Sequence, residues 1–428
     1  MLEMTRTGPE WKDKIITGDE TWVYGYDPET KRQSAEWRGQ GMAMRPLSKL
    51  DSAYRSILLS KFFGRGWGKP DHIKKLLKYR VFFADRHKSP QLLDHECSFQ
   101  IKKVESTMEH VLYEGQFVSP LAHLMPDVLP PESHLAHFQI LQPARPPHGK
   151  LRPLCLHLAG TGDHLISKNT CQPSFILTPA VMVSEQSSFR SMTEKSDQRS
   201  SLHNVSDIFV MGGSLCLESQ VLLSWAERNG FGPLAVSGLS MGGHMASIAA
   251  GHWHKPLALA PCLSWTTAST VFTQGVMSAA VPWRLLEDQL KKVPAYLEDI
   301  LPSFTYPYKE SAEPADTAAP CTARQFMRLI MDEFTHLAGF ARPVDPAMAV
   351  LVAALHDAYV PPNPSIEPLD QLWAGSELRR LDCGHVAAFI LNQAEFRKAI
   401  LDALEKTARS YYGDTMLPQT PLNNQLTT

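Results

Sequence analysis

The chain has 428 residues, of which 43% are hydrophobic and 20% are charged, and its formal net charge is -2. Its length fits one large catalytic domain with extensions, or two domains, and its composition is that of a soluble protein with a substantial core. The nearly neutral charge gives no reason to expect a nucleic-acid partner. The sequence contains no run of about 18 apolar residues, so it does not predict a membrane-spanning helix.

The chain contains 7 cysteines, which are scattered, odd in number and never spaced as Cys-x-x-Cys. This pattern argues against a disulfide framework and against a structural zinc site, so no bound metal is expected. Residues 1–10 contain no apolar stretch of the kind that a secretory signal needs. We therefore expect a protein of a reducing, intracellular compartment.

Residues 17–24, with the sequence TGDETWVY, resemble part of the catalytic core of mariner-type transposases. The resemblance implies that Asp19 corresponds to the first metal-binding aspartate of that family. No second and third aspartate follow in a matching context, and a single carboxylate cannot hold two magnesium ions for phosphoryl transfer. We interpret residues 1–41 as a non-functional fusion segment.

Residues 42–104 form a predicted extension whose centre is basic. Between Arg45 and Arg80, lysine and arginine greatly outnumber Asp51 and Asp71, and aromatic and aliphatic residues are interleaved with them. Such a stretch is typical of an organelle-targeting segment or of a helix that contacts a membrane surface. It is equally typical of a basic helix packed on a domain, and both interpretations remain open.

Strand-like and helical patterns alternate over residues 105–410, which predicts one α/β domain with a mostly parallel sheet and helices on both faces. An early hairpin is expected within residues 110–125. The expected strands lie at residues 135–142, 151–158, 233–239, 257–260, 347–355 and 377–381. The expected helices lie at residues 214–229, 241–252 and 386–407. Residues 282–320 are rich in proline and predict a cap or insertion, and residues 411–428 predict a loose tail.

The most informative motif is Gly238-Leu239-Ser240-Met241-Gly242, which follows a short apolar strand and precedes a helix of small residues. A serine in so tight a strand-to-helix turn needs small neighbours, because the strand and the helix approach each other closely there. The alternative is a glycine-rich loop with a capping serine. We predict that Ser240 is a catalytic nucleophile.

A serine hydroxyl reacts only when a base removes its proton, and the base of this arrangement is a histidine near the carboxyl end of the domain. Among the 17 histidines, His385 follows a predicted strand and a glycine at the start of the last helix. His356 and His336 are weaker candidates. We predict that His385 is the base.

The acid that orients the base should follow a late strand. Asp357 fits, since it follows the apolar strand at residues 347–355 within the sequence Asp-Ala-Tyr-Val-Pro. Asp345 precedes that strand and should lie at the wrong end of the sheet. Asp382 is expected within the strand before His385, so Asp357 is the predicted acid.

An oxyanion hole requires two backbone N–H groups. One is expected from Met241, the residue after the nucleophile. The other is expected from the loop at residues 157–163, where Gly160 and Thr161 are the candidate donors. The alternative for this loop is an ordinary turn between a strand and a helix.

Together, residues 157–163, 238–247, 261–265 and 384–385 resemble the α/β-hydrolase family. The resemblance covers residues 44–162 and 199–410. It implies an α/β-hydrolase fold and a serine hydrolase that cleaves acyl esters, with a lipid or phospholipid substrate and a mitochondrial location. The expected mechanism needs no cofactor, and any membrane-surface contact is expected from the basic stretch.

Residues 164–197 depart from the resemblance. The family implies a helix and a central strand after the oxyanion loop, and this segment matches neither. Residues 175–183 have strand-like composition, but Pro179 would interrupt a hydrogen-bonded ladder. The alternative to an active hydrolase is therefore a catalytically inactive protein of the same fold.

Overall fold

The computed structural model describes residues 50–54, 62–93, 97–108, 110–144, 151–160, 180–184, 202–306 and 321–413. The predictions made for residues 1–41, for Thr161, for most of residues 164–197 and for the tail after residue 413 fall outside the described residues.

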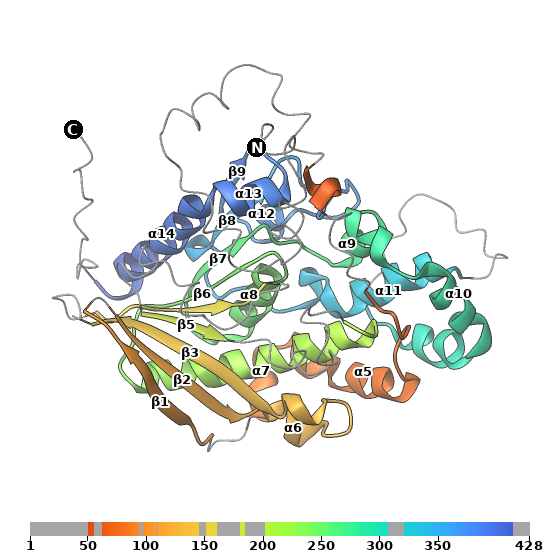
Figure 1. Cartoon of the computed structure of the whole chain (residues 1–428), viewed down its shortest axis with the longest axis horizontal. Coiled ribbons are helices and arrows are strands. Elements are labelled where there is room, and N and C mark those ends of the chain that lie inside the picture. The colour runs from red at the N-terminus through yellow and green to blue at the C-terminus, as the bar shows by residue number, and fades with distance from the viewer. Residues whose placement is uncertain are drawn as a thin grey trace, which may run out of the picture.

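The described strands form one nine-stranded sheet in the order β1-β2-β3-β5-β4-β6-β7-β8-β9 (Figure 1). The strands are β1 Gln100–Ser106, β2 His110–Val118, β3 Leu135–Pro143, β4 Leu154–Leu158, β5 Ala180–Ser184, β6 Leu234–Leu239, β7 Ala258–Cys262, β8 Val350–Ala354 and β9 Glu377–Leu381. The first three strands are an antiparallel meander, and β3 pairs antiparallel with β5. From β5 to β9 every pairing is parallel. This confirms the predicted fold class.

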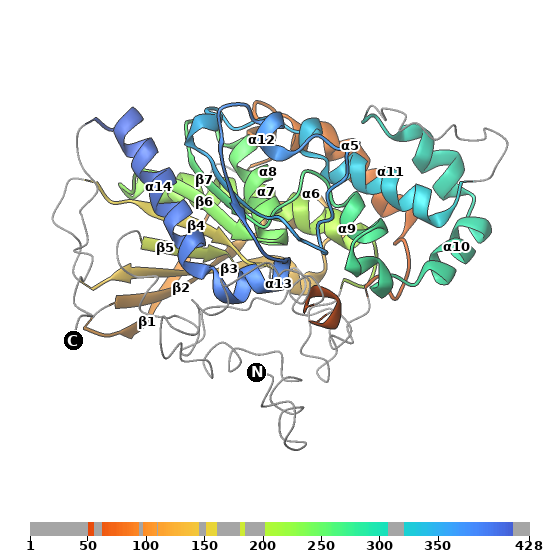
Figure 2. The ribbon, with the colours of Figure 1, turned by 90° about the horizontal axis from the view of Figure 1, so that it is seen from above.

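Helices cover both faces of the sheet, as Figures 1 and 2 show. They are α5 Pro70–Ala84, α6 Pro120–Leu124, α7 Ser206–Arg228, α8 Met241–His252, α9 Ser269–Thr273, α10 Trp283–Lys292, α11 Ala323–Thr335, α12 Leu369–Leu372, α13 His385–Leu391 and α14 Gln393–Tyr411. Short 3-10 segments lie at η2 Ser89–Leu92, η3 Pro131–Ser133, η6 Val276–Ala280, η8 Leu301–Ser303, η9 Leu337–Gly339 and η10 Pro346–Met348, with a π turn at η7 Tyr296–Ile300.

The two faces of the sheet belong to two hydrophobic clusters. Leu234 and Val236 of β6 join the cluster that contains α7 and α8, whereas Ala235 between them joins the cluster that contains α14. This division follows from the period of two along a strand, which points successive side chains to opposite faces. Both faces of β6 are therefore buried, which explains why Leu234, Ala235 and Val236 are all apolar.

The region predicted as a cap contains α10, η7 and η8, and α11 follows it. In both views α10 lies at the end of the molecule opposite β1 (Figures 1 and 2). The helix α11 begins with a capping box, in which Thr322 and Gln325 each bond to the other's backbone N–H.

Five large apolar residues in the described part of the basic stretch are buried. Phe62, Phe63, Trp67, Ile73 and Leu76 all belong to the larger cluster, and none is more than 5% exposed. The burial of these side chains favours the interpretation of residues 62–84 as a basic segment packed on the domain. They are not available as a membrane-binding face.

The segment that departs from the family pattern supplies a central strand. β5 begins directly after Pro179, so the ladder of Ala180–Ser184 does not include the proline. It pairs with β3 on one side and β4 on the other. The sheet position that the family pattern requires is therefore filled.

Two predicted helices have different bounds in the structure. α7 begins at Ser206 rather than at residue 214, since its first turns are buried against the core despite Gly212 and Gly213. The prediction of one closing helix over residues 386–407 is wrong. There are two helices, because α13 ends at Leu391 and α14 starts at Gln393, with Asn392 between them. Asn392 has a backbone ψ of 25°, which ends one helix and starts another in a new direction.

Among the described helices, α7 alone is long and apolar enough to cross a membrane, but 83% of its apolar window is buried inside the protein. Such burial is typical of a core helix.

Candidate active site

Ser240 occupies a strained turn between β6 and α8. Its backbone angles are φ 55° and ψ -116°, a combination that costs energy for a residue with a side chain. The turn is held by a hydrogen bond from Ser240 N to the carbonyl of Cys262 in β7, at 2.8 Å. The strain presents the hydroxyl at the carboxyl edge of the sheet.

The glycines on either side of Ser240 are required by close packing. A Cβ on Gly238 would lie 2.3 Å from the backbone of Gly242, and a Cβ on Gly242 would lie 2.1 Å from the carbonyl oxygen of Leu158. The second approach brings the start of α8 against the loop after β4. These short distances leave no room for a side chain at either position, which is the reason predicted for both glycines in the motif.

The structure brings Ser240, His385 and Asp357 together at the carboxyl ends of three parallel strands. Nε2 of His385 lies 3.1 Å from Oγ of Ser240, and Nδ1 lies 2.6 Å from Oδ2 of Asp357. A carboxylate only accepts hydrogen bonds, so Nδ1 carries the proton and Nε2 is left to accept one from the serine hydroxyl. Asp357 and His385 are buried, at 7% and 8% exposure.

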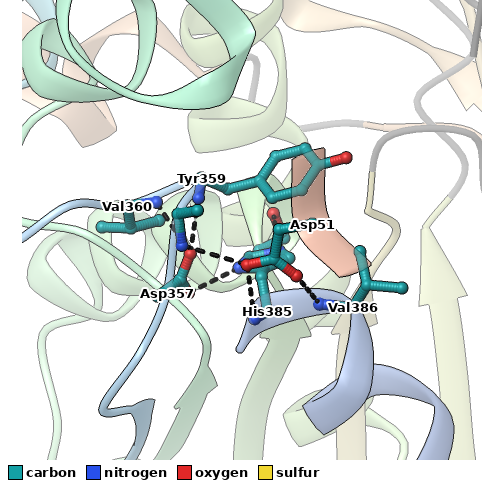
Figure 3. Close-up of polar contacts among 8 residues, drawn as sticks. Asp51, Asp357, Tyr359, Val360, His385 and Val386 are labelled. Atoms are coloured by element: carbon teal, nitrogen blue, oxygen red, sulfur yellow. Dashed lines mark hydrogen bonds and ion pairs between the residues drawn. The ribbon is translucent and has the colours of Figure 1, made fainter. Parts of the chain in front are cut away.

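The loop after β8 fixes Asp357. Its Oδ1 accepts hydrogen bonds from the backbone N–H groups of Tyr359 at 2.9 Å and Val360 at 2.8 Å, which leaves Oδ2 for the histidine (Figure 3). The ring of Tyr359 lies against the imidazole of His385, with centroids 4.9 Å apart. The carboxylate and the ring together define where the imidazole can lie.

Asp51 also reaches this site, from the helical turn at residues 50–54. Its carboxylate accepts hydrogen bonds from the backbone N–H groups of Ala358, His385 and Val386 (Figure 3). Asp51 was not predicted as a site residue, because nothing in the local sequence indicates that it lies beside His385.

The predicted oxyanion donors lie around the same turn. Met241 is the first residue of α8, directly after Ser240, and Gly160 is buried two residues after the end of β4. The contact between Gly242 and Leu158 brings these two segments together. Thr161 falls outside the described residues, so its role stays a prediction.

The other residues considered as base or acid, His336, His356, Asp345 and Asp382, have hydrogen-bond partners outside the Ser240–His385–Asp357 arrangement. Nε2 of His356 lies 3.0 Å from Asp382 in an exposed pair. Nδ1 of His336 lies 3.0 Å from the hydroxyl of Tyr306. Asp345 precedes β8 in the chain, whereas Asp357 follows it, and Asp345 accepts a hydrogen bond from Tyr411 at 2.5 Å.

Cys383 is close to the site but is poorly suited to act as a nucleophile. Burial raises the pKa of its thiol to about 11, and the carboxylates of Asp382, Asp51 and Asp357 add to the effect. The reactive form of cysteine is the thiolate, which is scarce at neutral pH when the pKa is so high. Within the described ranges, no group of three or more His, Cys, Asp or Glu side chains is arranged to hold a metal ion.

The strand order, the strained serine between β6 and α8, and the acid and histidine after β8 and β9 define the class: an α/β-hydrolase. The family model described as alpha/beta hydrolase domain containing 18 matches residues 60–406. The chain belongs to that family.

Solved structures with a similar arrangement include several esterases. An acetyl xylan esterase from Paenibacillus sp. R4 has 13% identity and a TM-score of 0.46, over 76% of this chain and 99% of its own. Acetyl xylan esterase 1 from Thermoanaerobacterium sp. JW/SL YS485 has 10% identity and a TM-score of 0.43, over 84% and 98%. The cell-wall-degrading esterase LipA from Xanthomonas oryzae has 12% identity and a TM-score of 0.37, over 78% and 96%.

Proposed function

We propose that this chain is a serine esterase that cleaves acyl esters through a covalent acyl-enzyme at Ser240. The observation that carries the proposal is the chain of two contacts at His385, 3.1 Å to the serine hydroxyl and 2.6 Å to the carboxylate of Asp357. A nucleophile, a base and an orienting acid within hydrogen-bond reach are the parts that acyl transfer requires.

In the first half of the reaction, Oγ of Ser240 attacks the ester carbonyl while Nε2 of His385 takes its proton. The resulting imidazolium is stabilised by the carboxylate of Asp357. His385 then gives that proton to the departing alkoxide, which leaves as the alcohol, and the acyl group remains bonded to Ser240.

In the second half, water replaces the alcohol. His385 removes a proton from the water, the hydroxide attacks the acyl carbonyl, and Ser240 leaves with the proton that His385 returns. In both halves, the backbone N–H groups of Met241 and of Gly160 or Thr161 are the proposed donors to the negatively charged oxygen of the tetrahedral intermediate. The chemistry needs no metal and no organic cofactor.

The proposed substrate class is a lipid or phospholipid ester. Apolar groups near the site support it: the ring of Tyr359 lies on His385, and Leu355, which follows β8 at the same edge, is 49% exposed. The family likeness is the other support. The basic stretch supports it less, because the side chains of Phe62, Phe63 and Trp67 are buried in the core.

The substrate proposal is tested by chain length. Values of kcat/KM should rise from p-nitrophenyl acetate to p-nitrophenyl palmitate, and vesicles of phosphatidylcholine should release free fatty acid. The highest value on acetate, with no fatty acid from the vesicles, would replace the lipid proposal with a short-chain esterase.

The enzymatic proposal is tested by a fluorophosphonate probe, which bonds to an activated serine with loss of fluoride. The purified wild-type chain should be labelled, and Ser240→Ala should not. Ser237→Ala is a matched control, because Ser237 is a buried serine of β6 that bonds to Ala260 O at 3.0 Å. A folded wild-type chain that resists the probe would favour the inactive alternative.

We also propose a mitochondrial, intracellular location. The support is the basic character of residues 45–61 together with the family likeness. Fractionation of cells that express a C-terminally tagged chain tests it, and recovery of the tag in the cytosolic fraction would contradict it.

A further inference from the structure

Asp51 is a buried carboxylate at the edge of the proposed active site. Its side chain is 0% exposed and lies against Gly384, where an added Cβ would meet the two carboxylate oxygens at 3.0 and 3.1 Å. A carboxylate removed from water so completely needs hydrogen-bond donors, since an unsatisfied one would be very costly.

Three backbone N–H groups supply those hydrogen bonds. Oδ2 accepts from Ala358 and from His385, both at 3.0 Å, and Oδ1 accepts from Val386 at 2.9 Å (Figure 3). Ala358 directly follows the proposed acid, and His385 is the proposed base itself. One side chain therefore joins the acid loop to the histidine loop through the backbone of both.

The position of Asp51 in the chain makes this contact informative. It lies 334 residues before His385 and ahead of residue 60, where the family match begins. The loops that carry Asp357 and His385 follow strands of the sheet, whereas Asp51 belongs to a separate helical turn at residues 50–54.

We infer that Asp51 is a positioning residue for His385 and Asp357: it holds the histidine backbone at the distance from the acid loop at which the imidazole reaches both Ser240 and Asp357. This inference rests on the proposed Ser240–His385–Asp357 mechanism. Asp51 contacts neither Ser240 nor the imidazole ring through any hydrogen bond in the described structure, so it acts through the backbone.

This role predicts a specific kinetic effect. A small displacement of a catalytic group lowers the rate of the chemical step by up to about 100-fold, even when the altered residue is remote from the reacting atoms. Asp51→Asn keeps the shape but turns one acceptor into a donor, which then faces a backbone N–H. We expect kcat on p-nitrophenyl butyrate to fall about 10-fold to 100-fold, with KM changed less than about twofold.

Glu333→Gln is the matched control. Glu333 is 1% exposed and its carboxylate also accepts three hydrogen bonds, from Thr305 N and Tyr306 N at 2.7 Å and from Thr305 Oγ1 at 3.0 Å. Outside its own helix, its hydrogen bonds within the described residues run to Arg80, Thr305 and Tyr306, and none of these belongs to the proposed active site. Both variants should lower the melting temperature, but only Asp51→Asn should lower kcat at a temperature where both are folded.

Gly384→Ala is a second variant in case Asp51→Asn fails to fold. It keeps the charge of Asp51 and forces only a small shift of its oxygens. It should lower kcat by a smaller factor. Wild-type kcat in folded Asp51→Asn, or in Gly384→Ala where Asp51→Asn does not fold, would overturn the inference while leaving the esterase proposal intact.

A spectroscopic readout separates this inference from the esterase proposal. The proton between His385 Nδ1 and Asp357 should give a low-field proton resonance in the Ser240→Ala chain, whether or not the wild type is an esterase. Adding Asp51→Asn should shift or abolish that resonance, and adding Glu333→Gln should not. An unchanged resonance in the Asp51→Asn chain would overturn the inference even if the wild type proves inactive.

Discussion

Asp357 and His385 are joined by a 2.6 Å contact between Oδ2 and Nδ1, the shortest link in the proposed catalytic arrangement. The other oxygen of Asp357 is already engaged by the N–H groups of Tyr359 and Val360. Only Oδ2 of Asp357 is therefore available to His385, and its hydrogen bond with Nδ1 determines both the tautomer and the orientation of the imidazole.

Replacing the acid by its amide should nearly abolish turnover. Asp357→Asn leaves the shape intact but offers an amide group in place of an acceptor, which stabilises the wrong imidazole tautomer. We expect kcat on p-nitrophenyl butyrate to fall by about 10³-fold to 10⁴-fold. Asp345→Asn, which changes an aspartate bonded to Tyr411, should keep kcat within about twofold. An active Asp357→Asn enzyme would mean that another acid serves His385.

A methyl group at Gly242 should disrupt the site. Its Cβ would come within 2.1 Å of Leu158 O and 2.7 Å of Ala159 O, and backbone atoms cannot move aside cheaply. We expect Gly242→Ala to lose about 1–3 kcal/mol of unfolding free energy and most of its probe labelling.

The control for that substitution is Gly212→Ala in α7, where the nearest atom to the new Cβ is Met245 Sδ at 3.8 Å. The added helix propensity should raise the unfolding free energy by up to about 1 kcal/mol. Urea unfolding measures both variants, and equal stability of the two would show that the approach at Gly242 is looser than the structure indicates.

A buried acid away from the active site should make stability depend on pH. Burial raises the pKa of Glu218 from 4.5 to about 7, with the hydrogen bond from Ser119 at 2.5 Å acting in the opposite direction. The folded state then holds this proton more tightly than the unfolded state. The stabilising contribution is complete below pH 4.5 and is lost as the pH rises to about 7.

Glu218→Gln stays neutral at every pH and retains an oxygen that can accept from Ser119. Its unfolding free energy relative to the wild type should therefore increase as the pH rises from 4.5 to about 7. Urea unfolding at a series of pH values measures this difference. A difference that is constant over the range would show that Glu218 is solvated.

The strand β5 should be protected from hydrogen exchange. Residues 180–184 pair with β3 and β4, so their backbone groups face neighbours on both sides. Among the described strands, β1 lies at an edge and pairs only with β2. Exchange monitored by mass spectrometry should be slower in a peptide that covers β5 than in one that covers β1. Exchange as fast as in an unfolded peptide would mean that the segment does not join the sheet.

Much of the arrangement could be predicted from local sequence. The glycine spacing around Ser240 identified the strained turn. The apolar run before Asp357, and the short strand and glycine before His385, placed both residues at the same edge of a parallel sheet. The bounds of β9 were also predicted correctly, since they follow from residue pattern alone. These features depend on residues that are close to one another in the chain.

The remaining features depend on contacts between distant segments. No local pattern brings Asp51 beside His385, because the contact exists only after the whole sheet has formed. The first turns of α7 contain Gly212 and Gly213, which disfavour a helix in isolation, and burial overrides that preference. The break at Asn392 accompanies the packing of α14 against β6, β7 and β8, which lie far from it in the chain.

The five residues of β5 connect two halves of the sheet that no other described strand joins. Without them, β3 and β4 would each present an unpaired edge, and open edges of this kind pair readily with other chains. Backbone hydrogen bonds do not depend on side-chain identity, so many apolar segments would satisfy this position. Damage to β5 should therefore appear first as aggregation, and the solubility of the protein depends on a segment that carries none of its proposed chemistry.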